Sequence, residues 1–280
     1  METTTEVNET LVKKGYEFLK ELCSFNADFN AFGGGSYNPV TNRVEYIMNR
    51  LEKHKIDYTL DMFQAIGGVP DFEMGKKSFA NVVVTIEGDN TEVTSVFLAH
   101  HDVNNLESEN CQDNTASVSN LLDLCVRLSA KKPANNVVIA FVDAEEIVNP
   151  RICGSQRLAQ NILGGKYGHV KYAVNLELSA NGRNYWQSYN RNDNTLAHHI
   201  RTLHPTTHRV STPYNDAFIL EGEGVPSVCI GSLDDRNLAD VKTKKFCRTW
   251  AMCHRMEDTF ESQANEGDMD AFVDYLETLI

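Results

Sequence analysis

The stretch AHHDVNNLESENCQDN, residues 99–114, places two histidines and several acidic residues directly after the apolar run TSVFL. Two further apolar runs end in the same way, since FVDAEE closes at residue 146 and VNLE at residue 177. Ligands of open α/β sheets bind beyond the carboxyl ends of the strands. We therefore expect these side chains to meet at one rim of a sheet. The candidates at strand ends are His100, Asp102, Glu145, Glu146 and Glu177, and the late segment CHRMEDT, residues 253–259, adds a fourth set.

Carboxylates that gather in one place repel one another unless a cation neutralises them. Imidazole mixed with carboxylate suits Zn²⁺, Mn²⁺ or Co²⁺, whereas an all-oxygen set suits Mg²⁺ or Ca²⁺. Two metals about 3.5–4 Å apart, bridged by one carboxylate, use roughly five protein ligands and leave a position for water. The opening stretch is therefore predicted to form a wall of a metal site.

Each of these residues has a simpler explanation when it is taken alone. A pair such as Glu145–Glu146 is more often a solvated strand end, and Asp113 before a helix is by default an N-cap. His100 and His101 can be one core histidine and one surface histidine. The prediction of a metal site depends on all the sets together, in this order and at strand ends.

The elements that must position these residues alternate between helical periodicity and short apolar runs. The predicted helices cover residues 8–24, 40–55, 115–129, 153–162, 192–203 and 262–279. The predicted strands cover residues 57–62, 79–88, 95–101, 135–146, 172–178 and 225–232, with loops at 32–39 and 62–78. Strands that alternate with helices predict a mostly parallel sheet covered on both faces.

Length and charge narrow the class of protein. The chain has 280 residues, 41% of them hydrophobic, and it contains no linker-like or repeated segment, so we expect one domain over residues 1–280. A net charge of −13 argues against nucleic acid as a partner. The sequence has no apolar run of 18 residues, which argues against a membrane span.

The cysteines and the N-terminus bear on the compartment. Seven cysteines are scattered along the chain without a CxxC pair, which is typical of free thiols in a reducing cytoplasm. We expect all seven to be reduced and none to bind metal. The N-terminal segment lacks the basic and apolar regions of a secretory signal. The expected localisation is therefore cytoplasmic.

From about residue 33 to its end, the chain resembles the double-zinc aminopeptidases of the bacterial leucyl aminopeptidase type, in peptidase clan MH, with glutaminyl cyclase and glutamate carboxypeptidase as relatives. HHD is similar to the family's His-x-Asp motif, QDNTASV to Asp-Asn-Ala-Ser-Gly, and FVDAEE to Asp-Ala/Gly-Glu-Glu. NLE is similar to Asn-Leu-Asp, with glutamate where aspartate is usual, and HRMEDT matches His-x-x-x-Asp-Thr. The resemblance implies a zinc-exopeptidase (phosphorylase/hydrolase-like) α/β fold, a three-layer αβα sandwich with a mixed, mostly parallel central sheet.

The resemblance also implies a role for each matched residue. The expected ligands of two Zn²⁺ ions are His100 and Glu177 for one metal, Glu146 and His254 for the other, and Asp113 as the bridge. Asp102 would lie behind His100 and fix its tautomer, and Glu145 would be the general base. The peptide bond between Asp113 and Asn114 is expected to be cis. The resemblance assigns no substrate-binding residue.

Three functional hypotheses follow: an exopeptidase, its enzymatic alternatives, and a binding protein without activity. The first is a metal-dependent exopeptidase, most directly an aminopeptidase that hydrolyses N-terminal residues from peptides, because an acidic rim attracts a free α-amino group. Its enzymatic alternatives are a single-zinc cyclotransferase similar to glutaminyl cyclase and a carboxypeptidase. The third hypothesis is a peptide-binding protein on a retired peptidase fold, although an intact Glu145 with all five ligands argues against it. Peptide is the expected partner, and the sequence specifies no oligomeric state.

Overall fold

The computed structural model describes residues 14–25, 39–64, 78–146, 153–189, 195–243 and 247–280. The predicted loop at 32–39 lies almost entirely outside this part of the chain, as do the first residues of the helix predicted over 8–24. The strands are β1 Tyr58–Gln64, β2 Ser78–Ile86, β3 Asn90–His100, β4 Asn135–Val142, β5 Val170–Leu176, β6 Asn184–Ser188, β7 His208–Val210 and β8 Ser227–Leu233.

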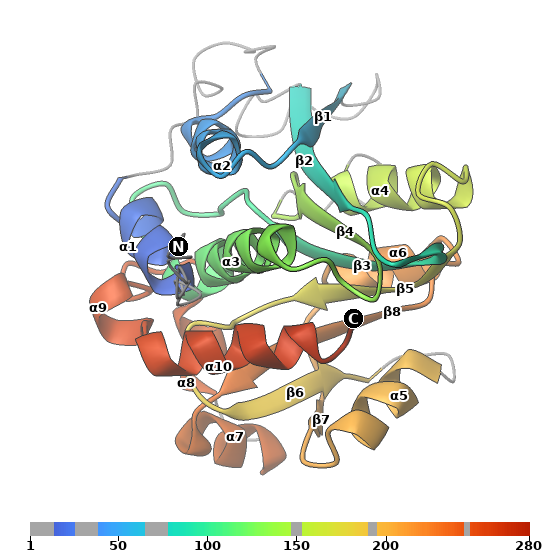
Figure 1. Ribbon diagram of the computed structural model, residues 1–280. Helices are drawn as coiled ribbons and strands as arrows, with labels where there is room; N and C mark the ends of the chain where they lie inside the picture. The colour runs from blue at the N-terminus through green and yellow to red at the C-terminus, as the bar shows by residue number, and fades with distance from the viewer. Residues whose placement is uncertain (1–13, 26–38, 65–77, 147–152, 190–194, 244–246) are drawn as a thin grey trace, which may run out of the picture.

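The helices fall between these strands and at the two ends of the described chain (Figure 1). They are α1 Gly15–Cys23, α2 Asn42–Lys53, α3 Ala116–Ala130, α4 Gly154–Leu163, α5 Thr195–Leu203, α6 Asp216–Gly222, α7 Asp235–Lys242, α8 Arg248–Met252, α9 Phe260–Gln263 and α10 Glu266–Glu277. A π-helical turn, η1 (Cys111–Thr115), precedes α3. Among the described residues, no helix combines the length and the apolar character needed to cross a membrane.

The eight strands form one sheet in the order β1-β2-β4-β3-β5-β8-β6-β7. The central strands β4, β3, β5 and β8 are parallel, whereas β1, β2 and β6 join by antiparallel pairing. Parallel strands end at the same edge of a sheet, so the segments after β3, β4 and β5 begin side by side. The predicted mixed, mostly parallel sheet is confirmed.

Alternation along the central strands produces the three layers. In β3, Phe97 and Ala99 belong to the core cluster that includes α1, α2, α3 and α10. Val96 and Leu98 point to the opposite face and pack with residues of α4 and α6. Because successive side chains of a strand face opposite sides, an uninterrupted apolar run is buried on both faces. The predicted αβα sandwich is therefore confirmed.

The structure differs from the sequence prediction in several elements. Strand β4 ends at Val142, so residues 143–146 form a turn beyond the strand. The helix predicted over 262–279 is divided, because the Asn265 side chain accepts the backbone N–H of Asp268 and caps a new helix. Two strands and three α-helices of the described chain were not predicted: β6, β7, α6, α7 and α8. All five are short, and short elements carry too few residues to show a period.

One glycine sets the spacing of two central strands near the rim. A Cβ at Gly231 in β8 would lie 2.0 Å from the carbonyl oxygen of Glu177, which directly follows β5. It would also lie 2.6 Å from the Trp186 ring. No side chain fits at such distances, so Gly231 allows β8 to approach the end of β5.

Candidate metal centre

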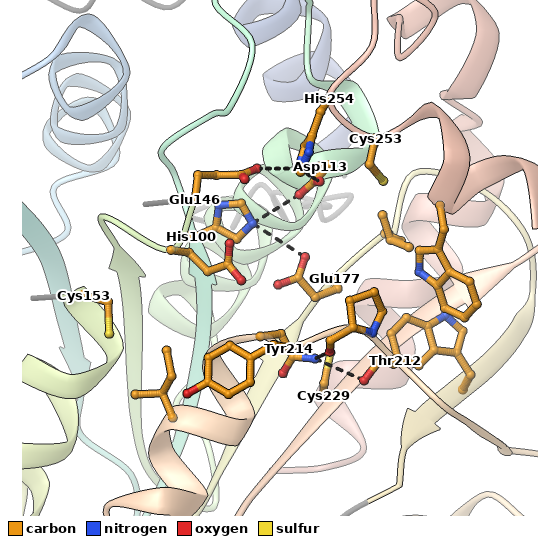
Figure 2. A pocket seen from close by; sticks show the side chains of 17 residues that line it. His100, Asp113, Glu146, Cys153, Glu177, Thr212, Tyr214, Cys229, Cys253 and His254 are labelled. Atoms are coloured by element: carbon orange, nitrogen blue, oxygen red, sulfur yellow. Dashed lines mark hydrogen bonds and ion pairs between the residues drawn. The ribbon is translucent and has the colours of Figure 1, made fainter. Parts of the chain in front are cut away.

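The three parallel strand ends bring most of the predicted residues together. His100 is the last residue of β3, Glu177 follows β5, and Glu145 and Glu146 lie in the turn after β4. Strand β3 pairs with β4 on one side and with β5 on the other. The imidazole of His100 therefore lies between the two acidic segments (Figure 2).

Asp113 enters the same space from η1, where its backbone leaves the helical conformation. The carboxylate of Asp258 accepts the backbone N–H groups of Gln112 at 2.8 Å and Asp113 at 3.2 Å, which fixes this turn. The Asn114 side chain donates to the carbonyl of Leu176, 2.8 Å away. The Asp113–Asn114 peptide bond is cis, as predicted.

His254 arrives from the loop after α8. Its φ of 65° lies in the left-handed region, and the Asn105 side chain donates to its carbonyl oxygen at 3.2 Å. The hydroxyl of Ser108 donates to the carbonyl of Arg255 at 2.7 Å. The loop after β3 thus holds the loop that carries His254.

These residues form two donor groups that share Asp113. In the first group, His100 Nε2 lies 3.3 Å from Asp113 Oδ1 and 3.7 Å from Glu177 Oε2. In the second, His254 Nε2 lies 3.1 Å from Asp113 Oδ2 and 3.1 Å from Glu146 Oε1. Within each group the ligand atoms lie within 4.8 Å of one another, as expected of donors around one ion. We call these sets the deep group (His100, Asp113, Glu177) and the outer group (Asp113, Glu146, His254).

The donor chemistry of both groups fits zinc. Each offers one imidazole nitrogen and two carboxylates, a mixture that Zn²⁺ accepts and that Mg²⁺ and Ca²⁺ rarely use. A third combination, His100 with Glu145 and Glu146, also meets the same spacing. All seven cysteines are free, and none belongs to a donor group among the described residues.

Asp102 has more contacts than the prediction gave it. Its Oδ1 atom lies 3.4 Å from Nδ1 of His100, and its backbone carbonyl lies closer to the same nitrogen, at 3.1 Å. Its carboxylate also accepts the backbone N–H groups of Glu145 at 3.2 Å and Glu146 at 3.0 Å. Asp102 therefore connects the end of β3 to the turn after β4.

The electrostatics of the centre reveal an excess of buried negative charge. Burial raises the pKa of Glu146 to about 7 and that of Glu145 well above its usual range. Burial also acts to raise the pKa of Asp113, but hydrogen bonds from His100 and His254 outweigh it and lower that pKa. The hydrogen bond to Asp113 is the largest cause, and that to Glu146 the next, of the rise in the pKa of His254 to about 10. The two imidazoles thus supply positive charge beside these carboxylates, and a bound metal ion would supply it as well.

Two buried acids near the centre were given no role by the sequence prediction. Asp258 holds the η1 turn, and it lies within the quoted motif HRMEDT, so that motif carried its signal. Asp216 begins α6 and is fully buried. Burial raises the pKa of Asp216 to about 7, against the opposing effect of His100, and the Asp216 carboxylate in turn helps to raise the pKa of Glu145.

A cavity of about 360 Å³ opens onto both donor groups and onto Glu145. Its remaining wall is mostly apolar, and no lysine or arginine is among its lining residues in the described chain. Trp186 and Trp250 meet edge to face there, with ring centroids 6.3 Å apart. Tyr214, which is 53% exposed, forms part of the rim (Figure 2). The other apolar and small lining residues include Leu178, Pro213, Ile219, Cys153, Cys229 and Cys253.

Known proteins share this architecture. The sequence profile of peptidase family M28 matches residues 81–279. No curated protein matches the chain. Among solved structures, a glutaminyl cyclase from Bacteroides thetaiotaomicron is similar with a TM-score of 0.70 at 16% identity, over 95% of this chain and 96% of that one.

Two other similar structures are peptidases. The LapA aminopeptidase from Legionella pneumophila has a TM-score of 0.68 at 17% identity, over 95% of this chain and 70% of that one. A Zn-dependent exopeptidase from Parabacteroides distasonis has a TM-score of 0.67 at 18% identity, over 94% and 95%. At such identities these structures establish a shared fold.

Proposed function

Because the chain belongs to peptidase family M28, we propose that it is a zinc-dependent exopeptidase, and specifically an aminopeptidase. The observation that carries this proposal is the pair of donor groups joined by Asp113 at the base of an apolar cavity. In this proposal His100 and Glu177 would hold one zinc ion, Glu146 and His254 would hold the other, and Asp113 would offer a carboxylate oxygen to each group.

Glu145 is the general base in the proposed reaction. It lines the cavity and belongs to neither the deep nor the outer group, so its carboxylate is available to the attacking water. Zinc bound at the centre would polarise the scissile carbonyl and lower the pKa of water. Glu145 would take the proton of the attacking water and deliver it to the leaving amine. Asp102 would hold the Glu145 backbone in place for this transfer.

The cavity supports cleavage at the amino end of a peptide. A free α-carboxylate would find no lysine or arginine among the described lining residues, whereas an α-ammonium group would be attracted by the surrounding carboxylates. Trp250, which is partly exposed and packs edge to face with the buried Trp186, offers an apolar contact surface beside the donor groups. The proposed substrates are therefore peptides with an apolar N-terminal residue.

A glutaminyl cyclase is the second candidate, and one observation favours it. The Bacteroides cyclase shares the fold of this chain with a TM-score of 0.70, and the chain covers 96% of it, about as much as it covers of the Parabacteroides exopeptidase. A cyclase would close the α-amino group of an N-terminal glutamine onto its own side-chain amide, and it would release ammonia. Such a reaction needs no attacking water. In our hypothesis it requires a single zinc ion.

One set of measurements separates these functions. We would assay zinc-loaded protein on amino-acid anilides and on glutaminyl peptides, with Glu145→Gln as the inactive control, and determine zinc by elemental analysis. Anilide hydrolysis with two zinc ions per chain supports the aminopeptidase. Ammonia release from glutaminyl peptides with one zinc ion supports the cyclase. Bound zinc without turnover on either set would favour a peptide-binding protein.

Two further expectations remain part of the proposal. The seven free cysteines support a reducing compartment, and we place the protein in the cytoplasm. We also treat residues 1–280 as one zinc-exopeptidase domain.

A further inference from the structure

Arg43 is a buried cation behind the metal centre. It is the second residue of α2, yet it is only 4% exposed. Helix α2 lies on the same side of the sheet as α3 (Figure 1). Arg43 does not line the cavity that opens onto the donor groups. A buried guanidinium is costly unless it is paired and hydrogen-bonded, so its contacts call for an explanation.

Those contacts join two segments that supply the deep group. Nε of Arg43 donates to the backbone carbonyl of His101 at 2.7 Å, immediately after His100. Nη2 donates to the hydroxyl of Thr115 at 2.8 Å, two residues after Asp113. One rigid planar group therefore joins the end of β3 to the end of η1, directly before α3. The distance between His100 and Asp113 depends on how these two segments are held.

The charge of Arg43 also lies near the turn after β4, which supplies Glu145 and Glu146. Burial lowers the pKa of Arg43 to about 10, with Cys23 and Asp102 opposing the shift, so the guanidinium stays charged at neutral pH. The carboxylate of Asp102 accepts the backbone N–H groups of Glu145 and Glu146. Arg43 therefore lies near the carboxylate that connects the end of β3 to the turn after β4.

We propose that Arg43 is a positioning residue of the metal centre, whose guanidinium fixes the separation of His100 and Asp113 by joining the end of β3 to the end of η1. Arg43 is not among the residues that line the cavity, so it would contact neither substrate nor zinc. The proposal rests on the proposed zinc-dependent function, because it concerns the ligands of that centre. Residues that orient metal ligands typically contribute about 10–100-fold to metal affinity.

The test compares Arg43→Lys with Arg127→Lys. Both arginines are 4% exposed, but Arg127 pairs with Asp123 and Asp274, which supply no ligand. Lysine keeps the charge and cannot bond two acceptors in a fork. The readouts are zinc affinity by competition with a chromogenic chelator, kcat and KM at saturating zinc, and thermal unfolding of the metal-free protein.

We expect Arg43→Lys to weaken zinc binding by about ten-fold or more. It should lower kcat with little change in KM, because Arg43 lies outside the cavity. Arg127→Lys should reduce thermal stability without changing zinc affinity. An equal loss of zinc affinity in both variants would overturn the proposal, since the effect would then follow from general destabilisation. Wild-type zinc affinity and kcat in Arg43→Lys would overturn it as well.

A second variant keeps the test decisive if Arg43→Lys does not fold. Thr115→Val preserves the shape of a fully buried side chain and removes one guanidinium acceptor. We expect a smaller loss of zinc affinity, and wild-type affinity in this variant would count against the proposal. A wild-type protein that binds no zinc would overturn the proposed function and this inference together. Normal zinc binding by both Arg43→Lys and Thr115→Val would overturn this inference alone.

Discussion

His100 and His254 contact opposite oxygens of the same carboxylate. Nε2 of His100 lies 3.3 Å from Oδ1 of Asp113, and Nε2 of His254 lies 3.1 Å from Oδ2. Their surroundings differ sharply, because the His100 side chain is 1% exposed and the His254 side chain 46% exposed. The two donor groups are therefore unequal in their access to solvent.

This inequality predicts the order in which metal is lost. We expect a chelator to remove the ion of the outer group first, because its histidine is open to water. His254→Ala should bind one zinc ion per chain with little loss of fold stability, whereas Asp113→Ala should weaken both sites. Elemental analysis after timed dialysis against chelator measures this. Simultaneous loss of both ions from the wild type would contradict the prediction.

The adjacent acids Glu145 and Glu146 should separate catalysis from metal binding. We expect Glu145→Gln to keep the fold and both metals and to lose about 10²–10⁴-fold in kcat, since an amide cannot accept a proton. Glu146→Gln should instead weaken the outer metal site. The measurement is kcat together with metal content for both variants. If Glu145→Gln lost metal and regained activity with added zinc, while Glu146→Gln kept metal but was inactive, the two roles would be reversed.

Asp216 should make the metal-free protein less stable as the pH rises. Its folded-state pKa of about 7 lies above the ordinary value of 3.8, chiefly because of burial, so the folded chain binds the proton more tightly than the unfolded chain. The resulting stability is present below pH 4 and is lost as the pH rises towards 7. Asp216→Asn cannot ionise, so its advantage should grow to as much as about 4 kcal/mol at pH 8, at about 1.4 kcal/mol per pKa unit.

Urea unfolding of metal-free wild type and Asp216→Asn at pH 4, 6 and 8 checks this sign. The two curves of unfolding free energy should diverge as the pH rises. Parallel curves would show that the Asp216 carboxyl has an ordinary pKa in the folded protein.

Gly231 should tolerate no side chain. Gly231→Ala places a methyl group 2.0 Å from the carbonyl oxygen of Glu177, so β8 or the end of β5 must move. Overpacking of this kind costs about 1–3 kcal/mol in unfolding free energy, and it should also weaken zinc binding by displacing Glu177. Gly222→Ala is the matched control, because a Cβ there meets nothing within 4 Å. Equal unfolding free energies for the two variants would refute this reading of the β5–β8 contact.

The central sheet, and the convergence of acidic residues and histidines at its rim, could be predicted from the sequence for a physical reason. Strands buried on both faces appear as uninterrupted apolar runs, and their polar ends mark the rim of a parallel sheet. His100, Glu146 and Glu177 could therefore be placed together from the sequence alone. Asp216 could not, because its importance arises from burial at the start of α6. The contacts of Arg43 could not be predicted either, since they depend on how α2 packs against segments far along the chain.

The positions of the ligands along the chain set the order in which synthesis completes the two donor groups that share Asp113. All three residues of the deep group are encoded between positions 100 and 177, on segments attached to the directly paired strands β3 and β5. The outer group must wait for His254, which follows the last strand of the sheet. On the ribosome, an emerging chain would therefore complete the two halves of the centre in succession.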